Sequence, residues 1–213
     1  NTALGYGALG LNNSGAHNTA VGKGTMEANT TGIQNTALGS RALDAAQTVN
    51  NNTAIGYEAL TLCTIGDNTA VGASAMAATT TGAYNTAVGR AALDGLETNH
   101  YNTAIGYAAL GGAVTADYNT AVGANALLVN GSGYYNNAFG YAALDACTSG
   151  HSNTGIGAQA LGAQTTGNDN VAVGVSALAA QQTPSNNTAV GKSAGAALTG
   201  ENNVIIGKDA GLL

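Results

Sequence analysis

Apolar and polar residues follow one another along this chain in a pattern that returns every 17 residues. We call each unit a rung and number its positions from its Asn. Position 1 is Asn, positions 2 and 3 are mostly Thr and Ala, position 4 is large and apolar, and position 5 is Gly. Ala recurs at position 8 and Leu or Met at position 9. A variable stretch rich in Gly, Ser and Thr completes the rung. The rungs begin at Asn1, Asn18, Asn35, Asn52, Asn68, Asn85, Asn102, Asn119, Asn136, Asn153, Asn170, Asn187 and Asn203, and two of the steps are 16 residues long.

A rung of this length predicts an all-β repeat architecture. Helix-pair repeats need more than about 30 residues per unit, which this period does not supply. Thr and β-branched residues favour strands, and the constant Gly at position 5 fits a sharp corner. Positions 1–4 and 7–9 of each rung are therefore predicted to form two short strands. Stacked in parallel, about 13 coils would form one β-solenoid or flat β-roll spanning residues 1–213.

The alternation of side chains along a strand predicts which positions face the interior. Positions 2 and 4 share one face, and positions 1, 3 and 5 share the other. Because position 4 is always large and apolar, its face is predicted to point into the coil, towards the Leu or Met of position 9. The Ala column of position 3 would then face outward. The Asn column of position 1 is predicted to form amide hydrogen bonds from rung to rung.

A column held to Ala on an outer surface indicates close packing against another copy of the chain. The alternative is that Ala fills a tight corner inside the coil. The candidate chain–chain interface consists of Ala3, Ala20, Ala37, Ala54, Ala70, Ala87, Ala104 and Ala121.

The low charge of the chain makes some classes of binding partner unexpected. Only 8% of residues are charged, and the net charge is −6. Five Lys and Arg residues cannot neutralise many phosphates, so nucleic acid is not an expected partner. No apolar run approaches the ~20 residues of a membrane-spanning helix, so membrane insertion is not expected either.

Residues that could carry chemistry are dispersed. The histidines stand apart, at His17, His100 and His151. Asp44, Asp94 and Asp145 share position 10 but are three rungs apart, or ~14 Å at strand spacing. We therefore expect no enzyme, no metal site and no cofactor. Cys63 and Cys147 are five rungs apart, so they are expected to be free thiols.

The tyrosines are the one aromatic cluster. Tyr84, Tyr101, Tyr118 and Tyr135 occupy position 17 of four consecutive rungs, and Tyr134 adjoins them. They are predicted to form a ladder on one edge of the coil. Such a ladder could bind a cell-surface glycan or a protein receptor, or it could serve stacking alone.

The repeat, as in "NNTAVGKSAG", resembles the NTAVG-type repeat shafts of phage tail-fibre and tail-spike proteins and of bacterial surface proteins. It is more distantly similar to the head repeats of trimeric autotransporter adhesins. Those repeats form a left-handed β-roll that trimerises. The resemblance implies a left-handed coil, a homotrimer and a location outside the cell, at the cell surface or on a virion.

Three functions remain open at this point. The leading hypothesis is a structural fibre, shaft or adhesin stalk that gives rigid reach, as a segment of a longer protein. A second is an extracellular filament whose subunits stack through uncapped solenoid ends. A third is ice binding through the Thr column at position 2. That column comprises Thr2, Thr19, Thr36, Thr53, Thr69, Thr86, Thr103 and Thr120.

Overall fold

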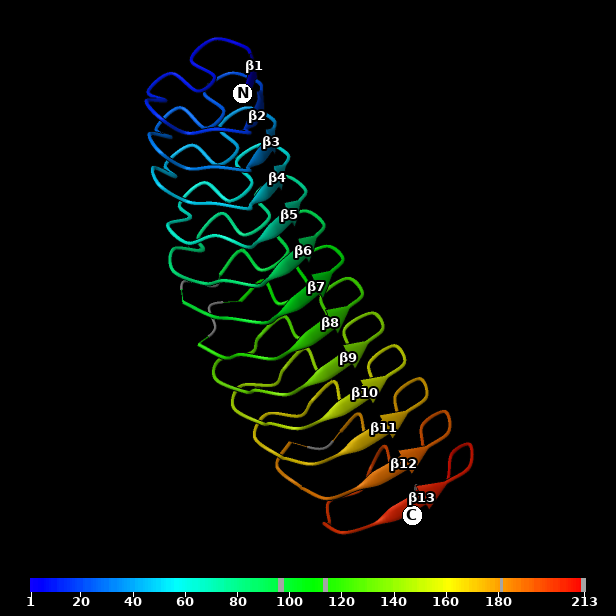
Figure 1. The fold of residues 1–213 in the computed structure, drawn as a ribbon. Helices are drawn as coiled ribbons and strands as arrows, with labels where there is room; N and C mark the ends of the chain where they lie inside the picture. The colour runs from blue at the N-terminus through cyan, green and yellow to red at the C-terminus, as the bar shows by residue number, and fades with distance from the viewer. Residues whose placement is uncertain (96–97, 113–114, 181, 212–213) are drawn as a thin grey trace. The chain divides into compact units, whose positions relative to one another are not determined.

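The computed structural model describes residues 1–95, 98–112, 115–180 and 182–211. Within them, thirteen three-residue strands pair in parallel and in chain order, one strand per rung (Figure 1). The predicted parallel β-solenoid with a 17-residue repeat is therefore confirmed. The strands are β1 (Thr2–Leu4), β2 (Thr19–Val21), β3 (Thr36–Leu38), β4 (Thr53–Ile55), β5 (Thr69–Val71), β6 (Thr86–Val88), β7 (Thr103–Ile105), β8 (Thr120–Val122), β9 (Asn137–Phe139), β10 (Thr154–Ile156), β11 (Val171–Val173), β12 (Thr188–Val190) and β13 (Val204–Ile206). The chain divides into two compact units, Asn1–Ala104 and Ile105–Leu213.

The second predicted strand, at positions 7–9, is wrong. In the described residues these positions form consecutive turns, and positions 7 and 9 adopt left-handed backbone conformations. Asn125 and Leu127, for example, have φ angles of 59° and 50°. The turns still contribute to the stacking of rungs, because the Leu127 N–H donates to the carbonyl of Ala143 in the next rung at 3.0 Å. Each rung therefore has one strand on one side of the coil. The other residues of the rung form turns that lead back to the next strand (Figure 1).

The predicted facing of the strand is also wrong. The middle residue of nearly every strand, Ala at position 3, is buried, while positions 2 and 4 point outward. In β8, Ala121 is 0% exposed, whereas Thr120 and Val122 are partly exposed. The position 9 residues do lie inside the coil as expected, with Leu127 and Leu144 both 0% exposed.

The narrow coil interior explains why Ala rather than Val points inward. A methyl group added at Gly155, the position 3 residue of β10, would lie 3.5 Å from the Leu144 side chain of the rung before. Ala at position 3 thus makes van der Waals contact with Leu at position 9. The last two rungs reverse this arrangement. Ile205 occupies position 3 of the last rung, and its side chain lies beside Gly195 and Gly211, which occupy position 9. A large residue at one position requires a small one at the other.

The position 1 asparagines form the predicted ladder of amide hydrogen bonds within each unit. In eleven rungs the backbone N–H of the Asn donates to Oδ1 of the Asn one rung earlier at 2.9–3.0 Å. In the 17-residue rungs the side-chain Nδ2 donates to the carbonyl at position 15 of its own rung, as from Asn136 to Gly150 at 2.8 Å. One buried side chain therefore closes its own coil and holds the next coil in register.

The Gly at position 5 is required by the backbone that follows each strand. Gly123 has a φ of +134°, and a Cβ added there would lie 2.4 Å from the carbonyl oxygen of Gly140 in the next rung. This conformation is essentially restricted to Gly, and the close approach leaves no room for a side chain. The corner fixes the spacing at which successive rungs stack.

We expect the Asn136→Ala variant to lose about 2–4 kcal/mol of unfolding free energy. The substitution removes the 2.8 Å bond to Gly150 and leaves the buried N–H of Asn153 without its Oδ1 acceptor. The matched control is Asn137→Ala, next in sequence but on the outer face of β9, which should change stability by less than about 1 kcal/mol. Urea unfolding followed by circular dichroism measures both. Equal losses in the two variants would contradict the role given to the ladder.

Candidate functional site

The outward side chains of positions 2 and 4 form the most regular surface of the molecule, which we call the sheet face. Position 2 supplies mostly Thr hydroxyls and methyls. Position 4 supplies Leu4, Val21, Leu38, Ile55, Val71, Val88, Ile105, Val122, Phe139, Ile156, Val173, Val190 and Ile206. The strands pair residue for residue, so Thr19 lies beside Thr36 and Val21 beside Leu38. The sheet face therefore carries a Thr column and an apolar column, side by side.

The sheet face contains no ionisable side chain among its described residues. Its apolar column is open to solvent even in the middle of each unit, with Leu38 50% exposed and Ile156 43% exposed. Charged residues lie elsewhere on the rung, as at Arg41, which pairs with Asp44 at 3.5 Å and Glu58 at 2.6 Å. Large contiguous apolar surfaces are uncommon on soluble monomers, so the sheet face is a candidate interaction surface.

The structure contradicts the predicted alanine interface at seven of its eight residues, and only Ala3, in the first rung, is exposed. Ala20, Ala37, Ala54, Ala70, Ala87, Ala104 and Ala121 are all 0% exposed, because they pack inside the coil. They are not accessible to a second chain, so tight interior packing, the alternative reading of the column, holds. The sequence does not identify position 4 as a surface site, because large apolar residues favour an interior position.

The tyrosines stack within each unit. In the first unit, the rings of Tyr84 and Tyr101 are 5.0 Å apart and nearly parallel. In the second, Tyr118 and Tyr135 stack at 5.1 Å, and Tyr134 meets Tyr135 edge-on at 5.4 Å. All five are between 43% and 54% exposed. The predicted stacking is therefore present, and the rings remain accessible from solvent.

The described acids and histidines are dispersed along the coil and do not form a metal-binding group. In the residues that the structure describes, no set of three or more His, Cys, Asp or Glu side chains could hold a metal ion. Partial burial raises the pKa of Asp94 and of Asp145. His100 accepts a hydrogen bond from the Ala83 N–H at 3.2 Å, and His151 stacks on Tyr134 at 4.8 Å. These histidines are held by structural contacts.

Both cysteines are free thiols inside the coil, as predicted. The Cys63 thiol donates to the carbonyl of Ile65 at 2.7 Å, and the Cys147 thiol donates to that of Gly150 at 3.4 Å. Burial raises the pKa of both thiols, that of Cys147 to about 11. Since the thiolate is the reactive form, burial and the raised pKa disfavour reaction of either thiol at neutral pH.

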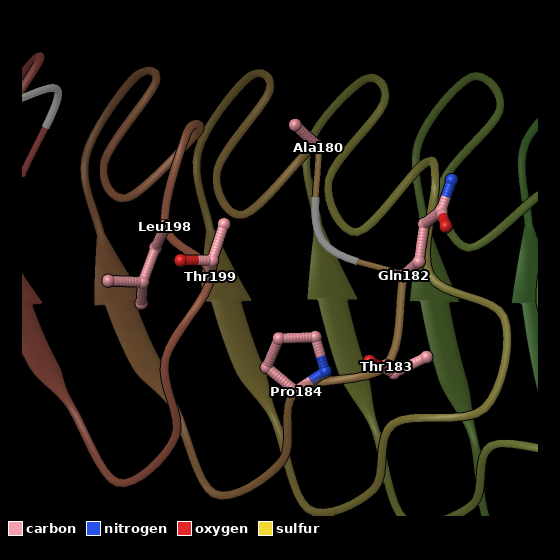
Figure 2. Close-up of a pocket in the computed structure, with 6 residues that line it drawn as sticks. All are labelled: Ala180, Gln182, Thr183, Pro184, Leu198 and Thr199. Carbon is pink, nitrogen blue, oxygen red and sulfur yellow. The ribbon is translucent and has the colours of Figure 1, made fainter.

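A hollow of about 210 Å³ lies on the second unit, between residues of two consecutive rungs (Figure 2). It is lined by Ala180, Gln182, Thr183, Pro184, Leu198 and Thr199. The side chains that Figure 2 labels carry no charge and do not converge on one point. The polar side chains of the hollow are the Gln182 amide and the hydroxyls of Thr183 and Thr199.

No protein-family model, curated protein or solved structure matches this chain. The described part of the chain also lacks any helix with the length and hydropathy of a membrane span. The sheet face and the tyrosine cluster are therefore the candidate sites on structural grounds alone.

We expect Cys63 and Cys147 to be unreactive toward a disulfide reagent such as dithionitrobenzoate at about pH 8. At that pH only about one Cys147 thiol in a thousand is ionised, and both sulfurs are 0% exposed. Both should react at once in guanidinium chloride. Ser149→Cys places a thiol on the exposed loop and is the positive control. Rapid modification of the native wild-type chain would show that the coil opens there.

Proposed function

We propose that this chain is a structural repeat protein that associates with copies of itself through the sheet face, as the shaft or stalk of a fibre outside the cell or on a virion. The observation that carries the proposal is the uncharged apolar column at position 4, exposed along both units. The resemblance to fibre shafts and adhesin heads favours three chains.

Self-association suits the shape and chemistry of this surface. Its side chains repeat with the period of the strands, so two copies can meet along many rungs with the same contacts. Burying one half-exposed Val, Ile or Leu contributes about 1 kcal/mol, so several rungs together supply enough free energy for a stable complex. Thr at position 2 adds methyl contacts and hydroxyls that can hydrogen-bond across the interface.

We expect light scattering to give a mass of about three times 20.6 kDa for the purified chain. Val71→Lys combined with Val173→Lys places one charge on the sheet face of each unit and should shift the mass to that of a monomer. An unpaired charge buried in an apolar interface costs several kcal/mol. Circular dichroism should be unchanged, because both side chains point outward.

The matched control for this double variant is Tyr57→Lys with Tyr141→Lys. These tyrosines are exposed at position 6, just past the strand and off the sheet face, so the mass should stay that of the wild-type chain. A monomeric wild-type chain would contradict the proposal. A very large, polydisperse mass that persists in the Val71→Lys, Val173→Lys variant would instead support stacking through the ends of the coil.

Ice binding is a second candidate, and one observation favours it. The Thr hydroxyls of position 2 point outward from paired strands in register, which presents a regular row that could order water. The column is interrupted in the second unit by Asn137, Val171 and Val204. The neighbouring column is apolar rather than a second row of hydroxyls. The geometry therefore supports self-association better.

The leading proposal predicts no thermal hysteresis for the wild-type chain, because the Thr column is covered by another copy. Nanolitre osmometry measures this directly. A monomer that separates its freezing and melting points, and that loses the effect in Thr69→Tyr but not in Tyr57→Lys, would favour ice binding instead. Thr69 lies on the sheet face in the middle of the first unit, so the Tyr ring would disrupt the row.

A further inference from the structure

A hollow of about 280 Å³ lies beside the tyrosine cluster of the second unit, away from the sheet face. It is lined by Thr115, Asp117, Tyr118, Tyr134 and Tyr135. The structural role proposed above does not use these residues. The hollow combines aromatic rings with a few polar groups, which is the composition of small-ligand sites.

The ring of Tyr134, which we call the platform, lines this hollow and stacks on a histidine of the next rung. Asp117, Tyr134 and His151 occupy position 16 of three consecutive rungs. His151 stacks on one face of Tyr134 at 4.8 Å and an interplanar angle of 12°. The hollow lies between Tyr134 and Tyr135 of one rung and Thr115, Asp117 and Tyr118 of the rung before.

The other two rings form a wall beside this platform. Tyr135 meets Tyr134 at an interplanar angle of 76°, so the two rings make a corner. Tyr118 stacks against Tyr135 at 5.1 Å and extends that wall. A flat ligand laid on Tyr134 would thus abut the Tyr135 wall.

The polar groups at the rim can hydrogen-bond such a ligand. The Asp117 carboxylate has about four acceptor sites in total, so it can accept from ligand hydroxyls as well as from protein groups. The Thr115 hydroxyl donates to the Gly131 carbonyl at 3.3 Å, and its oxygen can still accept. The three phenol groups both donate and accept.

The backbone that carries the platform is held in place. The Tyr134 carbonyl accepts from the Ser152 N–H at 3.0 Å, and the Asp117 carbonyl accepts from the Asn119 side chain at 3.2 Å. A site on such a framework loses little conformational entropy when it binds.

We propose that this hollow binds one pyranose ring of a neutral saccharide. The positively polarised C–H groups on one face of the sugar would lie on the negative face of the Tyr134 ring. Its hydroxyls would bond Asp117, Thr115 and the phenols. The carboxylate and the net charge of −6 disfavour acidic sugars. This inference goes beyond the proposed function, because it gives the side of the shaft a ligand.

The geometry favours a sugar over a quaternary ammonium ion. An aromatic cage surrounds a cation with several ring faces. Here Tyr118 and Tyr135 stack on each other, while Tyr134 stacks on His151 and lines the hollow beside Asp117. A single platform with a polar rim matches a flat ring that carries hydroxyls.

Saturation-transfer NMR on the whole chain tests the proposal. The probes are methyl β-galactopyranoside, methyl α-mannopyranoside and methyl β-glucopyranoside, each at about 10 mM, where weak millimolar binding is visible. At least one should receive saturation, strongest on the protons of one ring face. N-acetylneuraminic acid should receive little, and Asp117→Asn should reduce that discrimination.

Variants of Tyr134 assign the signal to the hollow. Tyr134→Ala and Tyr134→Leu should weaken binding about tenfold or more, because both remove the aromatic face. Tyr134→Phe keeps the ring and should bind within about threefold of wild type. Tyr141→Ala removes an exposed tyrosine elsewhere in the same unit and should have no effect. Matching thermal unfolding curves would establish that each variant is folded.

Three results would overturn the proposal. The first is no transfer to any of the neutral glycosides in the wild-type chain. The second is unchanged transfer in both Tyr134→Ala and Tyr134→Leu. The third is tighter, Tyr134-dependent binding of tetramethylammonium, which would reassign the hollow to a cation. The readout is independent of the number of chains, so its failure is distinct from failure of the proposed function.

Discussion

The hydrogen bonds of the buried Asn at position 1 are the interaction on which this fold depends. Each side chain accepts from the N–H of the next Asn and donates to a carbonyl on the far side of its own coil. A short strand of three residues has few hydrogen bonds of its own, and the amide ladder makes its register unambiguous. Once the coil is closed at this point, its interior is too narrow for two large side chains to face each other. That constraint places Ala at position 3 opposite Leu at position 9.

The period, the parallel β-solenoid, the Asn ladder, the interior Leu column and the free cysteines could all be predicted from the sequence. The facing of the strand could not be predicted from hydrophobicity, because a column of Val, Ile and Leu is equally compatible with a core and with an exposed interface. The exceptions to the repeat indicate which positions face the interior. Ile205 at position 3 coincides with Gly195 and Gly211 at position 9, and such compensation indicates that the two positions contact each other.

The turns at positions 7–9 could not be predicted from the sequence, for a different reason. Left-handed backbone is usually signalled by Gly or Asn. Here Leu127 and Ala142 adopt it because their neighbours in adjacent rungs fix the conformation through hydrogen bonds. Tertiary context thus overrides local preference. The sheet face carries no charged side chain, and the charged residues of the described rungs lie in the turns, as Arg41 and Glu58 do.

The two 16-residue rungs show which part of a rung tolerates the loss of one residue. The strands on either side keep their register, with Thr53 paired to Thr69 and Thr188 paired to Val204, so the missing residue is taken from the variable stretch that closes the coil. Every rung contacts only its neighbours through the same ladders. Duplication or deletion of a block of 17 codons would therefore lengthen or shorten the coil by one rung. The contacts between the other rungs would stay the same.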